Sequence, residues 1–385
     1  MRFRHPDGSL VHLAYCSNVH AADDAEGVMA QLHRFAAPLR ETLGLSRLGV
    51  GLWVSAPALQ GLLRDGRRLE AMRADLGRLG LEVVTLNGFP YRGFHEPVVK
   101  HAVYSPSWAD PQRASYTLDL VRLLGRLLPD DAAEGSISTL PLGWHGHWSA
   151  DRDVAARRAL TQVAEALAKE AAETGKPIRL AVEPEPGCVV ETMEEAAGVL
   201  AGLDTDWIGV CLDACHLAVQ FEEAAAAAEL LRDARVPLVK AQVSSALRIE
   251  RPGLSGARAL CESFVEPRFL HQVRERTPRG LHGVDDLESA LGGGLPARSE
   301  WRVHFHTPVH AGGENTTQPE LVRTLGTLVG GAAPLTHHLE VETYTWSVLP
   351  PDMRPHDDAG LVAGLASELS WTRRRLTELG LEEIE

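Results

Sequence analysis

The stretch IRLAVEPEPG, residues 178–187, is an apolar run that ends on a carboxylate, Glu183. Two later runs have the same form: IGVCLDACH ends its apolar part on Asp213, and HHLEVETYTW carries Glu342 at its end. A carboxylate cannot stay inside a packed layer without a partner, because an unpaired buried charge is too costly. We therefore expect these three side chains to reach the rim of a sheet, where a metal ion or a polar substrate satisfies them.

The spacing of these runs indicates a repeated unit. Asp213 follows Glu183 by 30 residues, and Gln242, at the end of PLVKAQ, follows Asp213 by 29. One strand, helix and strand step takes about 30 residues. Short apolar runs alternate with amphipathic stretches along the chain, which is typical of a parallel sheet covered by helices. The expected strands are residues 11–17, 48–54, 82–86, 136–140, 178–183, 208–213, 238–242 and 338–343.

Eight such steps predict an α/β fold, a closed (β/α)8 TIM barrel in a single domain over residues 1–385. A doubly wound open sheet is the competing fold, but it more often has a glycine-rich phosphate turn after its first strand, where this chain has CSNVHAADD. The interval between the seventh and eighth strands is much longer than the others, so residues 244–331 contain an insertion.

The insertion contains two further runs that resemble strands, 269–273 and 301–306. They predict a hairpin or a small subdomain over the C-terminal mouth of the barrel, unless 301–306 is itself a barrel strand. After the eighth strand, the charged end of the chain, RRRLTELGLEEIE, predicts a closing surface helix.

Composition excludes several classes of protein. The formal net charge of -14 argues against a nucleic-acid-binding surface, which normally shows a basic patch. Five cysteines without a paired spacing indicate neither a disulfide framework nor a cysteine zinc site, and they favour a reducing compartment. There is no signal-peptide pattern and no apolar run of about 18 to 20 residues, so we expect a cytoplasmic protein without membrane insertion.

Polar residues near the strand ends provide further candidates. His216 follows Asp213 by three residues, and a carboxylate beside an imidazole suits a divalent metal with mixed oxygen and nitrogen ligands. Alternation places His304 and His306 on one face, where two ligands can approach one ion, although a core or surface histidine needs no metal. Lys240 also points inward by alternation, and it suits either a substrate oxygen or an ion pair with a strand-end carboxylate.

A second group of histidines follows the fourth strand. His145 and His147 alternate with Trp144 and Trp148 in GWHGHW, which is compatible with a substrate wall because aromatic faces stack on sugar rings. The chain has no Gly-x-Ser-x-Gly elbow, Walker loop or His-Glu-x-x-His helix, so serine hydrolase, P-loop and zincin chemistry lack support.

The order of these residues resembles the xylose isomerase-like TIM barrels, which include sugar isomerases, ketose epimerases and endonuclease IV. Short segments such as LAYCSNVH, KAQVSSAL and LEVETYTW are also similar to the metabolite-traffic TIM barrels of the Ebo operon. That family is described by similarity as sugar-phosphate isomerase or epimerase-like. The first resemblance covers nearly the whole chain outside the insertion.

The resemblance implies roles for individual residues. Glu183, Asp213 and Glu342 match the metal ligands of the epimerase pattern, and His216 matches a substrate contact. The fourth ligand of the pattern is a histidine on the seventh strand, where this chain has Gln242. An amide oxygen binds borderline metals less well than imidazole does, so either inserted histidine, His304 or His306, is a candidate replacement.

These observations predict an isomerase or epimerase that depends on a divalent metal (Mn, Mg, Co or Zn) and acts on a small polyhydroxylated metabolite, a sugar or sugar phosphate. In an enediolate mechanism the metal stabilises the charge and Glu183 and Glu342 exchange the proton, with His216 and Lys240 as further catalytic candidates. One alternative is a phosphoester hydrolase of the endonuclease IV type, and another is a non-catalytic metabolite carrier or assembly protein of an Ebo-type pathway. A homodimer or pathway proteins are the expected macromolecular partners.

Overall fold

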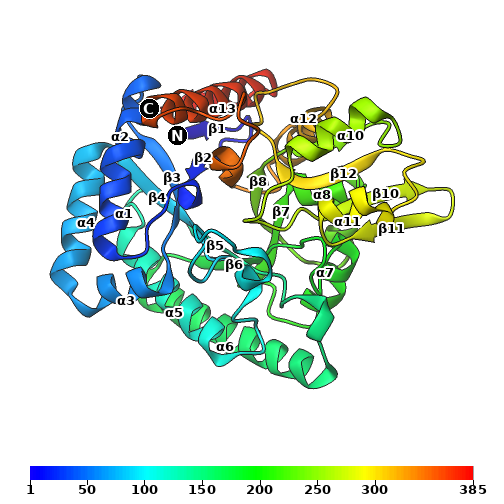
Figure 1. Cartoon of the computed structure of the whole chain (residues 1–385). Helices are drawn as coiled ribbons and strands as arrows, with labels where there is room; N and C mark the ends of the chain where they lie inside the picture. The colour runs from blue at the N-terminus through cyan, green and yellow to red at the C-terminus, as the bar shows by residue number, and fades with distance from the viewer. Residues whose placement is uncertain (385) are drawn as a thin grey trace.

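The core of the protein is a parallel barrel (Figure 1), seen in a computed structural model that describes residues 1–384 apart from the side chain of His147. Each barrel strand pairs in parallel with the next one, and the last strand also pairs with the first, which closes the ring. The prediction of a closed (β/α)8 barrel is therefore confirmed, and an open sheet is excluded. The barrel strands are β2 (Leu10–Cys16), β3 (Leu48–Trp53), β4 (Leu81–Asn87), β5 (Gly135–Thr139), β6 (Ile178–Val182), β7 (Ile208–Asp213), β8 (Leu238–Val243) and β13 (His338–Val341).

Helices surround this barrel, as Figure 1 shows. Local sequence sets their ends: the longest begins after Ser149, whose side chain accepts a hydrogen bond from the Arg152 N–H, and ends at Gly175 in the left-handed region. The α-helices after the strands are α1 (Ala25–Gln31), α2 (Ala37–Thr42), α3 (Ala56–Arg64), α4 (Gly66–Leu79), α5 (Pro111–Leu127), α6 (Ala150–Thr174), α7 (Met193–Leu200), α8 (Ala214–Val219), α9 (Ala224–Asp233), α10 (Ser255–Ser263), α11 (Leu287–Ser289), α12 (Gln318–Val329) and α13 (Asp358–Glu378).

The insertion builds a second, antiparallel sheet in the order β11, β10, β12, β9, which lies beside α8 in Figure 1. One of its strands covers the predicted run 301–306, so that run is a strand of this sheet and not of the barrel. The prediction of a strand at 269–273 is wrong in its bounds, because Phe269 and Leu270 lie in a loop that lines a pocket. The strands are β9 (Ala246–Ile249), β10 (Val273–Thr277), β11 (Gly280–Val284) and β12 (Trp301–His306).

The two ends of the chain meet beside α13 (Figure 1). The predicted closing helix is wrong in its last part: α13 ends at Glu378, Gly380 has a φ of 93°, and the residues after it form β14 (Glu382–Ile384). This strand pairs antiparallel with β1 (Arg2–Arg4), which pairs with β2. Residue Glu385 lies outside the described residues. Among residues 1–384, every helix is too short or too polar to span a bilayer.

Candidate functional site

Three carboxylates meet at the C-terminal mouth of the barrel. Glu183 follows β6, Asp213 ends β7 and Glu342 follows β13. One oxygen from each lies within 4.8 Å of the others, and all three side chains are buried. The structure therefore brings together the three residues that the strand-end pattern selected, although they are as much as 159 residues apart in the chain.

Two asparagines orient Glu342. The Nδ2 groups of Asn18 and Asn87 donate to its Oε1 over 2.7 and 2.8 Å. Hydrogen bonds of this kind favour the ionised carboxylate and fix which oxygen faces the other acidic residues. Sequence reasoning missed both asparagines. Asn87 ends the apolar strand β4, so the strand-end signal that selected the carboxylates applies to it as well.

Asp213 is fixed through one oxygen and left free at the other. Its Oδ1 accepts hydrogen bonds from the His216 N–H at 2.8 Å and from the Ser244 hydroxyl at 2.9 Å. Among the described residues, its Oδ2 has no hydrogen-bond partner, and the same holds for Oε2 of Glu183. Buried polar atoms are normally paired, so these two oxygens indicate a missing cation or ligand.

The pKa shifts of these carboxylates also indicate a missing cation. Burial raises the pKa of Glu183 well above its ordinary value, and the neighbouring charges of Glu342 and Asp213 raise it further. Burial and the charge of Asp213 likewise raise the pKa of Glu342 well above its ordinary value. Like charges in a buried site are costly, and a divalent cation among them removes that cost.

Gln242 lies in the same layer of the barrel interior as Asp213. Its Cα pairs with Asp213 on one side and with Glu340 on the other. Its side chain is 1% exposed, and neither amide atom has a hydrogen-bond partner within residues 1–384. A free amide oxygen beside three carboxylates suits a hard or borderline divalent cation. The buried, unpartnered oxygens of Glu183, Asp213 and Gln242 therefore fit a divalent cation.

The inserted strand β12 brings two histidines to the mouth. His306 Nδ1 lies 2.7 Å from the backbone oxygen of Glu342, so Nδ1 must carry the proton that it donates to this carbonyl. Its Nε2 is thus a bare lone pair; it lies 3.9 Å from Asp213 Oδ2 and has no hydrogen-bond partner in the part of the chain that the structure describes. Burial lowers the pKa of His306 to about 4, so the ring is neutral near pH 7.

The Nε2 atoms of His304 and His216 face each other. His216 Nδ1 donates to the Pro184 carbonyl over 2.8 Å, and His304 Nδ1 lies 2.7 Å from Gln272 Oε1. Gln272 donates its Nε2 to the Pro186 carbonyl, which fixes the amide so that its oxygen accepts from His304. The two Nε2 atoms, 3.0 Å apart, therefore both present lone pairs and require a proton or a cation between them.

Lys240 lies one layer below this site. Its ammonium group forms an ion pair with Glu340, and both side chains are fully buried. Burial disfavours the charge of Lys240, but Glu340 outweighs burial and raises its pKa. Gly51 makes room for the pair, since a Cβ there would lie 1.8 Å from Glu340 Oε1. The partner is therefore Glu340 and not a mouth carboxylate, and Lys240 is not among the described residues that line the pocket.

The mouth opens into a pocket with a polar floor and an aromatic wall. Sequence reasoning missed Glu185, a floor residue that accepts a hydrogen bond from the Tyr104 hydroxyl over 2.7 Å. Burial raises the pKa of Glu185 to about 7. Its place in PEPG, two residues beyond a strand-end glutamate, was the available signal. The lining residues are Asn18, Asn87, Phe89, Pro90, Phe94, Lys100, Val103, Tyr104, Glu183, Glu185, His216, Phe269, Leu270, His304, His306, Glu342 and Tyr344.

The tryptophan and histidine segment takes another position. Trp144 packs against Tyr104 and over Gly187, whose φ of 88° and contact with the indole leave no space for a side chain. Neither Trp144 nor His145 is among the described residues that line the pocket, so the structure does not bring them to the floor. The predicted role of His147 concerns a side chain outside the described part of the chain.

The family of the chain follows from its sequence together with this geometry. Residues 49–246, just over half of the chain, match the family described as Xylose isomerase-like TIM barrel. The chain belongs to this family. The matched segment includes β3 to β8 and two of the three mouth carboxylates, Glu183 and Asp213. No curated protein matches the chain in sequence.

Several solved structures share the fold at low identity. An L-ribulose 3-epimerase is 13% identical with a TM-score of 0.50, over 96% of this chain and 95% of its own. A D-allulose 3-epimerase from Methylomonas sp. is 12% identical with a TM-score of 0.53, over 95% and 98%. An IolI protein with a bound zinc atom is 11% identical with a TM-score of 0.51, also over 95% and 98%. At these identities the likeness establishes the fold alone.

Proposed function

We propose that this protein is a divalent-metal-dependent isomerase or epimerase of a small polyhydroxylated carbonyl compound. The observation that carries the proposal is the ring of Glu183, Asp213 and Glu342, with unpartnered buried oxygens at the ends of barrel strands. The fold shared with two sugar 3-epimerases supports it, as does the zinc atom in the IolI structure.

The metal would be held by the three carboxylates, with the Gln242 amide oxygen in place of an imidazole. When bound, it supplies a Lewis acid that polarises the substrate carbonyl and stabilises the negative charge of an enediolate. Glu183 and Glu342 reach the pocket from different strands, β6 and β13, and can remove and return a proton on different faces of a carbon atom. Asn18 and Asn87 hold Glu342 in position.

The pocket favours an unphosphorylated substrate. Among its described lining residues Lys100 is the only lysine or arginine, and its ammonium group is already paired with Asp286. A phosphate group normally needs arginine, lysine or a helix N-terminus to balance its charge. Glu183, Glu185 and Glu342 add negative charge to the floor. We therefore infer a neutral sugar with a free carbonyl group as the substrate rather than a sugar phosphate.

A solvent-exchange assay tests this function. The manganese-loaded protein is incubated in deuterium oxide with free ketoses and with their phosphate esters, and deuterium uptake at carbon is followed by NMR. We expect exchange with at least one free ketose and at least a 100-fold lower kcat/KM for its phosphate ester, because an uncompensated charge in the pocket costs about 3 kcal/mol or more. Chelator treatment should abolish the exchange. Failure to exchange with any sugar, despite bound metal, would contradict the enzyme and favour a carrier.

The pathway is a separate part of the proposal. We propose an Ebo-type metabolite pathway as its setting, supported by segments such as KAQVSSAL and LEVETYTW. Two of these segments carry site residues: KAQVSSAL contains Gln242 and Ser244, and LEVETYTW contains Glu342 and Tyr344.

A further inference from the structure

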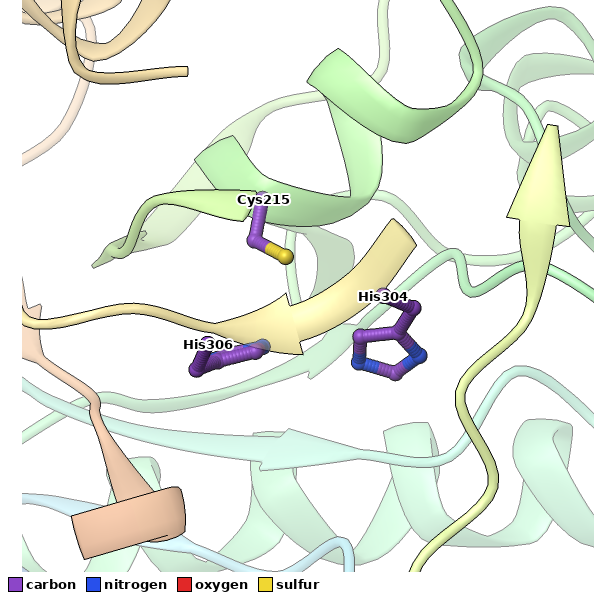
Figure 2. A group of neighbouring side chains, drawn as sticks. All are labelled: Cys215, His304 and His306. Atoms are coloured by element: carbon purple, nitrogen blue, oxygen red, sulfur yellow. The ribbon is translucent and has the colours of Figure 1, made fainter. Parts of the chain in front are cut away.

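A cysteine lies directly beside the inserted histidines. Cys215 is in the first turn of α8, within Asp-Ala-Cys-His, and it is fully buried. Figure 2 shows its sulfur directed toward β12, the strand that carries His304 and His306. One donor atom from each of these three residues lies within 4.8 Å of the other two. A barrel segment and the inserted sheet thus bring one thiol and two imidazoles to the same place.

The imidazoles at this place are ready to bind a cation. The Nδ1 hydrogen bonds of His304 and His306 leave both Nε2 atoms as lone pairs, and that of His306 is buried without a hydrogen-bond partner among the described residues. His216 adds a third lone pair, 3.0 Å from that of His304. Two imidazole nitrogens on one zinc ion lie about 3.3 Å apart at tetrahedral angles.

We propose that Cys215, His304 and His306, with His216 as fourth ligand, form a second metal site that takes a borderline cation such as Zn²⁺. Sulfur and nitrogen donors favour zinc, whereas the oxygen donors of Glu183, Asp213 and Glu342 suit manganese or magnesium. The two sites differ in chemistry although they are neighbours. Binding forms a zinc–thiolate bond, and the proton of Cys215 leaves to solvent.

A metal ion in the second site would cross-link the insertion to the barrel. Cys215 and His216 belong to α8, while His304 and His306 belong to β12, so one ion would connect this helix of the barrel to the inserted sheet. This inference concerns the metal alone and does not depend on which sugar, if any, the protein converts.

Cobalt substitution tests the second site. Metal-free protein is loaded with Co²⁺, whose thiolate complexes have a charge-transfer band in the near ultraviolet, and zinc is counted separately by mass spectrometry. We expect the band in the wild type and its loss in Cys215→Ser, with zinc falling from about two ions per chain to about one. His304→Ala should weaken the band. Cys261→Ser is the matched control, because this buried cysteine lies in α10, outside the cluster, and should leave both readouts unchanged.

The outcomes separate this inference from the proposed function. A thiolate band without sugar exchange would support the second site and contradict the isomerase. Sugar exchange with no thiolate band in the cobalt-loaded wild type would overturn the second site and leave the isomerase standing. If Cys215→Ser fails to fold, X-ray absorption at the zinc edge of the zinc-loaded wild type decides the matter. A sulfur ligand at about 2.3 Å from zinc supports the site, and a shell without sulfur overturns it.

Discussion

Replacing Glu183 with glutamine is expected to lower kcat/KM for the sugar exchange by about 10²- to 10⁴-fold, the usual contribution of a positioned acid or base. The substitution removes a base and a metal ligand at once. It keeps the shape of the side chain, so the barrel should remain folded. The metal-free variant should also be more stable than the metal-free wild type, because one of three crowded buried carboxylates has become neutral. Exchange kinetics and urea unfolding measure the two effects.

Glu222→Gln is the control for this substitution. Glu222 is also partly buried, and burial raises its pKa to about 7, but it holds the N-terminus of α7 through the Met193 N–H and lies outside the pocket lining. Its neutralisation should leave kcat/KM unchanged. Retention of full activity by Glu183→Gln would show that Glu183 is neither base nor ligand, and a loss of stability would contradict the assigned charge repulsion.

Removal of metal is expected to make the stability of the protein depend strongly on pH. Glu183 and Glu342 have raised pKa values when folded, so the folded state holds their protons more tightly than the unfolded state does. Their contribution is fully present below their ordinary pKa near 4.5 and is lost as pH rises toward the folded values. The contribution of these two carboxylates to the free energy of unfolding should therefore fall as pH rises above about 4.5. Buried histidines such as His306, whose pKa is lowered to about 4, act oppositely up to their ordinary pKa near 6.5, so the difference between the wild type and Glu183→Gln isolates the carboxylate contribution.

Added metal should reverse this loss. Mn²⁺ at about 1,000 times its Kd adds about 4 kcal/mol, and the gain should grow with pH because metal and protons compete for the same oxygens. Urea unfolding at several pH values, with and without Mn²⁺, measures both effects. The same titration of Glu183→Gln should show a shallower pH dependence and a smaller gain from metal. A wild type whose stability changes with neither pH nor metal would contradict the ring.

The barrel could be predicted from the sequence because each of its strands can be recognised from its own residues. Buried parallel strands appear in the sequence as apolar runs, and helical stretches separate them, so the ring follows from this alternation. The span of β7 (Ile208–Asp213) agrees with its expected bounds. The inserted sheet gave a weaker signal: β11 (Gly280–Val284) is largely exposed and begins with glycine, so no apolar run marks it. At the C-terminus, β14 forms only by pairing with β1, a contact between residues at opposite ends of the chain.

Part of the candidate site could be predicted from the sequence, namely those residues that a carboxylate at the end of an apolar strand identifies by itself. Glu183, Asp213 and Glu342 each stand out alone, whereas Asn18 and Asn87 gain meaning only from the carboxylate that they hold. The partner of Lys240 depends on Gly51, which makes room for Glu340 from another strand. The cysteine spacing gave no reason to expect a metal at Cys215, because its neighbours come from β12 rather than from a second cysteine. Local sequence patterns do not predict such contacts between segments that are far apart in the chain.

Anomalous diffraction from crystals soaked in Mn²⁺ tests the central claim most directly. We predict one manganese peak at the mouth of the barrel, about 2.0 to 2.4 Å from an oxygen of each of Glu183, Asp213 and Glu342. The same soak of Glu183→Gln crystals should give a much weaker peak. A wild-type crystal with no manganese among these three carboxylates, or with manganese bound only elsewhere, would contradict the account.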